Sequence, residues 1–309
     1  MSLSDPNDWL VVTTNAQEPS WCNTTASTGA LDNENGLHFR ILPMGASIVY
    51  GLMSFDGNGF RLGLQDLLLA NGTRTTMVGT QWSGNMSDNH HEAYQGLMVN
   101  DFNNVSYHSG AYDMGANVVL VHIGTNDCWW VKGETGEGAA TRIGYLLDSI
   151  REKLPDALVL ASTLIYNTNN KTDLCIQGIN SHLPAVVQSA VEKGQQVKLV
   201  DMYPVVPHDQ MAEDGTHPTD YGYQLMAHQW YDSIVNATKE SCVEQKAADT
   251  TATVPATSPG TSTPEIPAGS SGNTSSQSIA ATAGAGVVST HLATQLLVPI
   301  AMSALIFYL

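Results

Sequence analysis

Short apolar segments alternate with segments of helical periodicity along the middle of this chain. The clearest apolar segment is residues 117–123 (NVVLVHI), where the apolar residues are nearly consecutive, as is typical of a strand covered on both faces. Strands that alternate with helices pair in parallel through right-handed crossovers. The pattern therefore predicts an α/β fold of three layers, with helices on both faces of a central parallel sheet.

The same pattern gives the expected elements. Strands are predicted at 37–44, 76–79, 117–123, 157–163 and 197–202, and helices at 60–69, 141–154, around 182–193, and 220–235. Sites in parallel sheets form at the carboxyl ends of the strands. Ser47 and Asn126 both follow directly on predicted strand ends, so we expect a site to form there.

The chain of 309 residues divides by composition. Residues 36–240 carry the globular pattern and follow an N-terminal extension at 1–35. Residues 247–285 are almost entirely Thr, Ser, Ala, Gly and Pro. Such a segment buries too little apolar surface to offset its ordering entropy, so we predict a disordered linker there.

The C-terminus becomes apolar again. Small residues at 284–286 precede an uncharged spacer (287–295) and an apolar tail at 296–309 (LLVPIAMSALIFYL). This layout is that of a glycolipid (GPI) anchor signal, and we predict that function for residues 287–309. A single membrane span or a buried helix remains the alternative, although the tail is shorter than the roughly 20 residues that span a bilayer.

Other features favour an extracellular or cell-surface location. Seven Asn-x-Ser/Thr sequences occur, roughly twice the number that chance would give; they begin at Asn23, Asn71, Asn85, Asn104, Asn170, Asn236 and Asn273. No N-terminal leader pattern is visible after Met1. Either the natural start lies upstream, as the other features favour, or the protein does not enter the secretory route.

The cysteines give a weaker indication of the same compartment. The four are Cys22, Cys128, Cys175 and Cys242. No Cys-x-x-Cys spacing occurs, which argues against a zinc site. The even number suits two disulfides with three possible pairings in an oxidising compartment, and four free thiols are the alternative.

The chain is strongly acidic. It carries 12 Lys and Arg against 29 Asp and Glu, a formal charge of −17. Such a surface repels phosphate backbones, so nucleic acid is not expected as a partner. We expect a monomer that acts on a small ester or an acylated polysaccharide.

Two sequence blocks supply groups for nucleophilic catalysis. Ser47 lies in a Gly-x-Ser turn between a predicted strand and the next helix, where its own N–H points to a developing oxyanion. His217 is the candidate base that activates the Ser47 hydroxyl. Asp214, three residues earlier, is placed to orient the His217 ring.

Two further blocks complete the pattern. Asn126, in Gly124–Asp127 (GTND), offers a side-chain amide to an oxyanion, and Gly96 a backbone N–H that a Cβ-free residue brings close. The ordered blocks RILPMGASI, VGTQWSGNMSDNHHEAYQG, VLVHIGTNDC and DGTHPTDYGYQLMA resemble the SGNH (GDSL-type) hydrolases over residues 38–236. They are most similar to fungal members near carbohydrate esterase family three, the acetyl xylan esterase-like group.

The resemblance implies a flavodoxin-like SGNH hydrolase fold and a serine carboxylic ester hydrolase that deacetylates polysaccharide through an acyl-enzyme. It implies catalytic roles for Ser47, Asp214 and His217, and an oxyanion hole of Ser47, Gly96 and Asn126, with no cofactor. A lipase of the same family and a catalytically weakened, wall-anchored carbohydrate-binding glycoprotein are the alternative functions.

The chain departs from the family pattern at several positions. Ala46 replaces the usual Asp between Gly and Ser, so we expect the Ser47 loop to lose supporting hydrogen bonds. Ala93 and Tyr94 stand where relatives often have Gly and His, and Trp82 replaces a position that is often basic. The change at Ala93 and Tyr94 is expected to reshape the rim of the site.

Two neighbouring tryptophans and a histidine pair complete the set of candidates. Trp129 and Trp130 are predicted to form an aromatic platform for a sugar ring, and the alternative is that one or both pack in the core or under a loop. The sequence His90-His91-Glu92 invites a metal interpretation, but adjacent histidines point apart and no further ligands are evident. No metal is therefore predicted.

Overall fold

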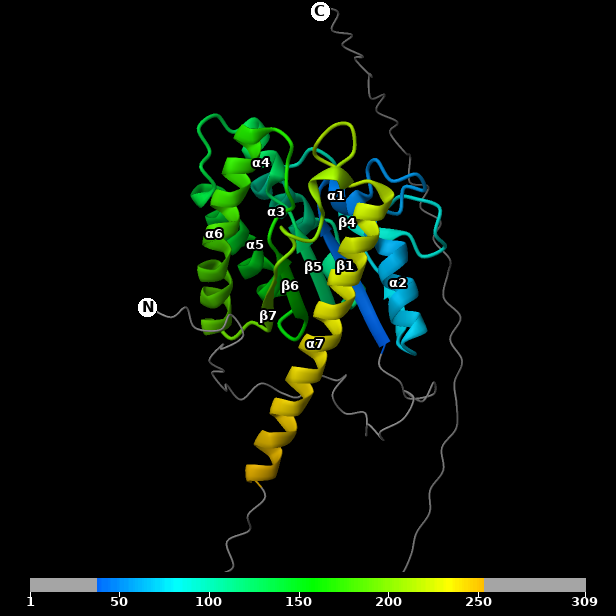
Figure 1. Ribbon diagram of the computed structural model, residues 1–309. Coiled ribbons are helices and arrows are strands. Elements are labelled where there is room, and N and C mark those ends of the chain that lie inside the picture. Colours follow the sequence, from blue (N-terminus) through cyan, green and yellow to red (C-terminus); the bar gives the residue numbers. More distant parts are fainter. Residues whose placement is uncertain (1–37, 253–309) are drawn as a thin grey trace, which may run out of the picture. The chain divides into compact units, whose positions relative to one another are not determined.

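The computed structural model describes the backbone of residues 38–252 and the side chains of residues 38–239. Within them, helices cover both faces of a largely parallel sheet (Figure 1). In chain order the elements are β1 (His38–Gly45), α1 (Ser47–Tyr50), α2 (Phe60–Ala70), β2 (Arg74–Met77), β3 (Gln81–Trp82), β4 (His90–Ala93), α3 (Val99–His108), the 3-10 helix η1 (Ala111–Met114), β5 (Val118–His122), α4 (Thr125–Trp130), α5 (Glu137–Lys153), β6 (Leu158–Ser162), α6 (Asn170–Glu192), β7 (Val197–Val200), the 3-10 helix η2 (His208–Gln210) and α7 (Asp220–Ala252).

The sheet has the strand order β3-β4-β1-β5-β6-β7, with β2 also paired to β1. Strand β1 pairs in parallel with β2 along its first half, with β4 at its carboxyl end, and with β5 on its other side. Among the described strands, only the β3–β4 pair is antiparallel. The predicted parallel sheet is thus confirmed, and a short antiparallel ribbon at its edge is added to it.

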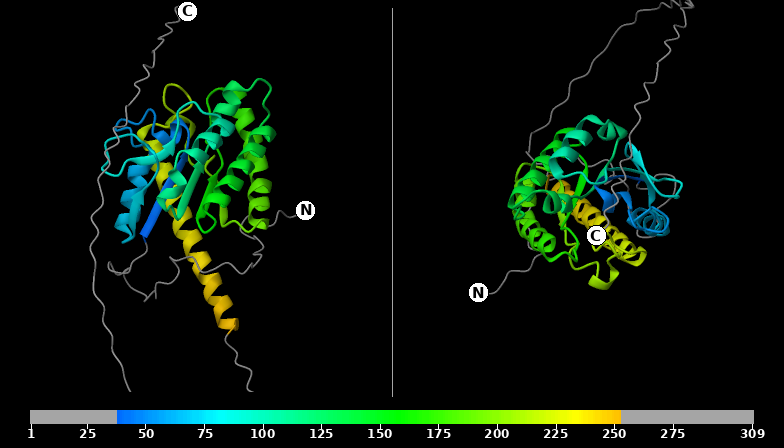
Figure 2. Two further views of the ribbon diagram at one scale, coloured as in Figure 1. Left: turned by 180° about the vertical axis from the view of Figure 1, so that it is seen from behind. Right: turned by 90° about the horizontal axis from the view of Figure 1, so that it is seen from above.

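The continuous apolar character of β5 follows from burial on both faces. Val119 and Val121 pack into the core beneath α3, α5 and α6, whereas Val118 and Leu120 pack into the core beneath α2 and α7. The two views in Figure 2 show these helices on opposite sides of the sheet. A central strand covered on both faces favours apolar residues at successive positions, as the sequence has.

Two of the predicted helices are longer in the structure than the sequence predicted. The helix predicted around 182–193 begins at Asn170, because the Asn169 side chain caps it by accepting bonds from Lys171 N and Thr172 N. The sequence pattern did not reveal this start, because the first turns of the helix are polar and Pro184 lies within it. The helix predicted at 220–235 continues to Ala252, into the start of the predicted linker. Helix α3, the short helices α1 and α4, and strands β3 and β4 were not predicted.

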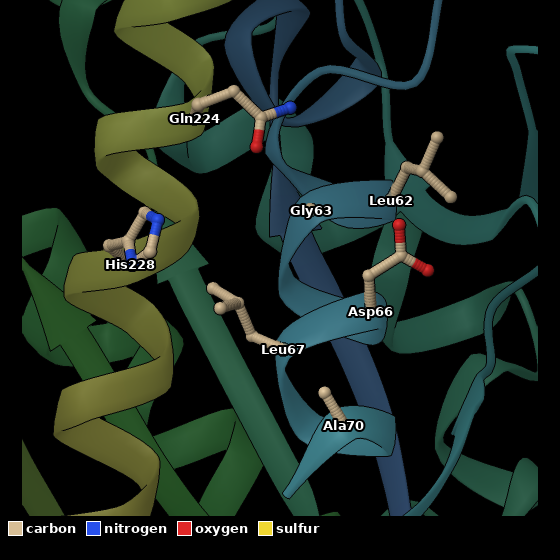
Figure 3. Close-up of a pocket in the computed structure, with 7 residues that line it drawn as sticks. All are labelled: Leu62, Gly63, Asp66, Leu67, Ala70, Gln224 and His228. Atoms are coloured by element: carbon tan, nitrogen blue, oxygen red, sulfur yellow. The ribbon is translucent and has the colours of Figure 1, made fainter.

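Helices α2 and α7 pack side by side. A hollow of about 330 Å³ opens between them (Figure 3). It is lined by Leu62, Gly63, Asp66, Leu67, Ala70, Gln224 and His228. None of these residues belongs to the predicted catalytic set.

Among the described residues, no helix combines the length and apolar character needed to cross a membrane. The predicted extension at 1–35, most of the predicted linker and the predicted anchor signal at 287–309 lie outside the described residues.

Candidate active site

The three residues predicted to carry catalysis meet at the carboxyl end of β1. The Ser47 hydroxyl lies 2.7 Å from Nε2 of His217, and Nδ1 of His217 lies 2.5 Å from Oδ2 of Asp214. With the proton on Nδ1 donated to Asp214, Nε2 is free to accept the Ser47 proton. The arrangement has the nucleophile, base and orienting group of a serine hydrolase triad.

The position of Ser47 is set by the end of β1. A Cβ on Gly45 would lie 2.2 Å from the carbonyl oxygen of His122 on β5, so only glycine lets the two strands approach this closely. Ala46 is half-buried and packs against the core on the α3 side. Ser47 then begins α1, which is a single turn, so the contribution of its helix dipole to an oxyanion at Ser47 is small.

The loop that carries the base is folded around the Asp214 carboxylate. Oδ1 of Asp214 accepts hydrogen bonds from Thr216 N (2.9 Å) and His217 N (3.0 Å). Burial alone would raise the pKa of Asp214, but these bonds and the His217 ring hold the pKa of this carboxyl below its ordinary value. Asp214 therefore stays ionised beside the histidine.

A second loop, after β6, holds the first in place. Thr168 N donates to Gly215 O at 2.9 Å. Gly215 has φ +68°, and a Cβ there would lie 1.7 Å from Thr168 Oγ1. The catalytic loop thus needs glycine at 215 both for its conformation and for close packing.

Of the two further oxyanion candidates, Asn126 lies in the first turn of α4 and Gly96 in the loop after β4. The Asn126 amide donates to Leu97 O at 3.0 Å, which joins the GTND loop to the segment after Gly96. Gly96 has φ +80°, and a Cβ there would meet no atom within 4 Å. No atom of the described residues therefore requires glycine here for lack of space, and the close approach of the Gly96 N–H to a substrate oxyanion stays a prediction. Glycine is favoured at 96 because of its left-handed conformation.

Three donors remain available at this end of the sheet. Among the described residues, the N–H groups of Ser47 and Gly96 donate to no acceptor, and the Asn126 amide has a second hydrogen. Such donors are what an oxyanion hole requires.

Asp127 fixes the relative position of these loops. Oδ2 of Asp127 accepts from Val99 N at 3.0 Å, and Oδ1 accepts from Nε and Nη2 of Arg142 at 3.0 and 2.8 Å. Arg142 also bonds Glu134. Burial raises the pKa of Asp127, and the bonds from Val99 and Arg142 oppose this rise. The hydrogen bonds from Val99 and Arg142 thus offset the cost of burying the Asp127 carboxylate.

A disulfide joins Cys128 on α4 to Cys175 on α6. It is one of the predicted pairings and fastens the helix that carries Asn126. The other two cysteines, Cys22 and Cys242, lie outside the described side chains, so the prediction of a second disulfide stays a prediction.

Both tryptophans that follow the GTND loop reach solvent. Trp129 is 44% exposed and Trp130 is 69% exposed. The alternative that they pack in the core is thereby ruled out. Trp82, on the edge strand β3, is 68% exposed.

Of the histidine pair, His91 is used within the fold. Nε2 of His91 lies 2.8 Å from Ser83 Oγ, and its Nδ1 accepts from Ala93 N. Burial lowers the pKa of His91 to about 3, so the ring is neutral. Both ring nitrogens of His91 are therefore occupied by protein groups.

Arg61 lies beneath the loops around the site. Its guanidinium is fully buried and donates to the carbonyl oxygens of Tyr50, Gly57, Ser83 and Asn89. Burial lowers the pKa of Arg61 to about 10. The residue holds these loops together by hydrogen bonds to their backbone.

Comparison with known proteins agrees with this geometry. A model of the GDSL-like Lipase/Acylhydrolase family matches residues 44–225, more than half of the chain. The chain belongs to this family. It is accordingly an ester hydrolase of the GDSL type, as the sequence blocks predicted. No curated protein sequence matches the chain.

Solved structures show the same fold. The family 3 carbohydrate esterase of Clostridium thermocellum is 24% identical, with a TM-score of 0.58 over 66% of this chain and 99% of that chain. A family 3 carbohydrate esterase from Talaromyces cellulolyticus is 19% identical, with a TM-score of 0.57 over 65% and 99%. An acetyl esterase solved with an acetate ion is 19% identical, with a TM-score of 0.55 over 65% and 99%.

Proposed function

We propose that this GDSL-family protein removes acetyl groups from polysaccharide through an acyl-enzyme on Ser47. The observation that carries the proposal is the continuous chain of hydrogen bonds from Ser47 through His217 to Asp214. The names of three structural neighbours, two carbohydrate esterases and an acetyl esterase, support the choice of substrate.

In the first step, Ser47 Oγ forms a bond to the ester carbonyl carbon and its proton passes to Nε2 of His217. The carbonyl electron pair moves to the oxygen, where the N–H groups of Ser47 and Gly96 and the Asn126 amide stabilise it. The bond to the sugar oxygen then breaks, and that oxygen takes the proton from His217. Acetyl-Ser47 remains.

In the second step, a water molecule attacks the acetyl carbon and gives its proton to His217. The bond from the carbonyl carbon to Ser47 Oγ breaks, Ser47 recovers the proton from His217, and acetic acid leaves and ionises to acetate in solution. Asp214 remains ionised throughout and stabilises the imidazolium in both steps.

The polysaccharide part of the proposal rests on Trp129 and Trp130. Both are exposed on α4, shortly after the oxyanion candidate Asn126. Exposed aromatic faces provide apolar area for the flat face of a sugar ring. The disulfide between α4 and α6 holds this platform in place.

The test of the reaction compares the full chain with Ser47→Ala on the acetate, butyrate and octanoate esters of p-nitrophenol. We expect acetate to be the best substrate and Ser47→Ala to lower kcat by about 10⁴-fold or more. Mass spectrometry of a rapidly quenched reaction should find an acetyl group on the peptide that contains Ser47. Equal rates in both proteins would reject the enzyme proposal, and a preference for octanoate would favour a lipase.

The test of the substrate compares acetylated xylan with p-nitrophenyl acetate. Trp129→Ala with Trp130→Ala should lower kcat/KM for the polymer about tenfold, which corresponds to the loss of roughly 1.4 kcal/mol of ring stacking. Trp82→Ala is the matched control, because Trp82 is about as exposed as Trp130 but lies on the edge strand. An equal effect of both changes would argue against a platform on α4.

We also propose that the protein is held at the cell surface by a lipid anchor. The support is the small-residue, spacer and apolar-tail layout of residues 284–309. Treatment of intact cells with a phospholipase that cleaves GPI anchors should release the protein. Retention after complete cleavage of a known anchored protein would contradict this proposal.

A further inference from the structure

Seven asparagines of the sequence begin an Asn-x-Ser/Thr pattern, the acceptor sequence for N-linked glycans. Five of them lie among the described side chains: Asn71, Asn85, Asn104, Asn170 and Asn236. We propose that these five asparagines carry N-linked glycans. Beyond the proposed hydrolysis, this assigns a covalent modification to five positions of the fold.

Exposure separates these asparagines from the others. All five are exposed, whereas only Asn100 and Asn169 are exposed among the nine described asparagines outside the pattern. Seven of fourteen are thus exposed, and five chosen at random would all be exposed about one time in a hundred. A glycan requires an exposed attachment point, so the distribution is the one that modification needs.

Hydrogen bonding agrees with this separation by exposure. The glycan is attached at Nδ2, so this atom should not be needed as a hydrogen-bond donor within the fold. Among the described residues, Nδ2 of none of the five donates a hydrogen bond. Six of the other nine do donate from Nδ2: Asn58, Asn89, Asn117, Asn126, Asn167 and Asn180.

Asn85 shows how a glycan fits without loss of structure. Its Oδ1 accepts a hydrogen bond of 2.9 Å from Asn58 Nδ2. Because attachment uses Nδ2 of Asn85, this bond remains in the modified protein. The Asn58 side chain, which is fully buried, therefore keeps its partner.

The compartment that attaches N-linked glycans is also one that permits disulfides. The Cys128–Cys175 disulfide is an observation separate from the asparagines. Both point to a chain that folds in the secretory route.

Most of the hydroxyl groups that complete the pattern are buried. Thr73, Ser106, Thr172 and Thr238 are each less than a tenth exposed. An enzyme that reads this hydroxyl reaches it only before the surrounding structure has formed. It follows that modification at these four sites precedes folding.

The first experiment maps the sites on the full chain isolated from its own organism. Enzymatic release of N-glycans in heavy-oxygen water converts each modified asparagine to a labelled aspartate that mass spectrometry identifies. We expect label at the five positions and none at Asn100 or Asn169. Asn169 is a stringent control, because it is exposed and adjoins Asn170. Label at fewer than all five positions would overturn the assignment of each unlabelled site.

The second experiment tests the pattern at one site, with the chain expressed through a eukaryotic secretory route. Thr172→Val removes the hydroxyl with little change in shape, whereas Thr172→Ser keeps it. We expect complete loss of the Asn170 glycan in Thr172→Val and its retention in Thr172→Ser. A glycan at Asn170 in Thr172→Val, or its absence in both the parent and Thr172→Ser, would overturn the assignment of this site.

Discussion

The side-chain amide of Asn167 donates a hydrogen bond of 3.0 Å to the hydroxyl of Thr216, the residue next to His217. Asn167 is buried, and its N–H donates to Asp173 on α6. Asp173 in turn accepts a bond from Tyr203. A line of polar groups thus connects α6 with the loop that carries the catalytic base.

This connection predicts that Asn167 positions His217. Asn167→Ala should lower kcat about fivefold and leave KM within about twofold, because one hydrogen bond worth roughly 1 kcal/mol no longer holds the loop. Steady-state kinetics with p-nitrophenyl acetate give both values.

The matched control is Asn180→Ala, which removes two hydrogen bonds to Leu164 in the same region without touching residues 214–217. Both variants should lose thermal stability, but only Asn167→Ala should lose kcat. Equal losses of kcat in the two variants would reduce the role of Asn167 to general stability.

Asn167 also shows what the sequence could not reveal. The catalytic blocks are local patterns, so Ser47, Asp214 and His217 could be singled out before their geometry was known. Asn167 belongs to no such block, and its partner Thr216 is distant in sequence. Its place just beyond β6, at the carboxyl edge of the sheet, was the only signal available.

The fold could be predicted where burial produces a recognisable pattern of apolar residues in the sequence. Strand β5 is buried at every position and is apolar at all but its last, because both of its faces are covered. Helix α6 was predicted only in its second half, because its first turns are polar and tertiary packing stabilises them. One such contact is the approach of Thr135 O to Gly178, where a Cβ would lie 1.9 Å away. Packing of this kind has no local signature.

The Ala46 position tests whether this chain is a weakened enzyme. We predict that Ala46→Asp raises kcat/KM by less than about threefold, because Ser47 already lies within hydrogen-bond distance of His217 with alanine present. The new carboxylate would also enter a half-buried position beside the site at a desolvation cost. Kinetics with p-nitrophenyl acetate measure the change, and a gain of about tenfold or more would show that the missing Asp limits activity.

The Cys128–Cys175 disulfide joins residues 47 positions apart. Replacement of both cysteines by serine should lower the free energy of unfolding by about 4 kcal/mol, the entropy expected for a loop of this length. The effect on kcat should be less than about threefold, because Asp127 still ties α4 to Arg142 and Val99. Urea unfolding and acetate-ester kinetics measure the two effects. A large loss of kcat with unchanged stability would contradict this division of roles.

Two buried histidines predict that the fold weakens in acid. Burial lowers the pKa of His91 to about 3 and of His122 to about 4. The unfolded chain binds protons at these rings below about pH 6.5, whereas the folded chain stays neutral until its lower pKa values are reached. Their stabilising contribution is therefore fully present above about pH 6.5. As the pH falls from about 6.5 towards 4, each histidine lowers the free energy of unfolding by up to about 1.4 kcal/mol per pH unit.

Urea unfolding at about pH 7 and about pH 5 measures this slope, and a variant of His122 tests its origin. His122→Asn keeps a donor for Ser162 Oγ, which lies 2.8 Å from His122 Nδ1, and removes one titrating ring. The two histidines together contribute part of the slope of unfolding free energy against pH. The variant should reduce that part by about half. An unchanged slope would exclude His122 as a source of the pH dependence, because a ring whose pKa is lowered by burial must release its proton when the chain folds.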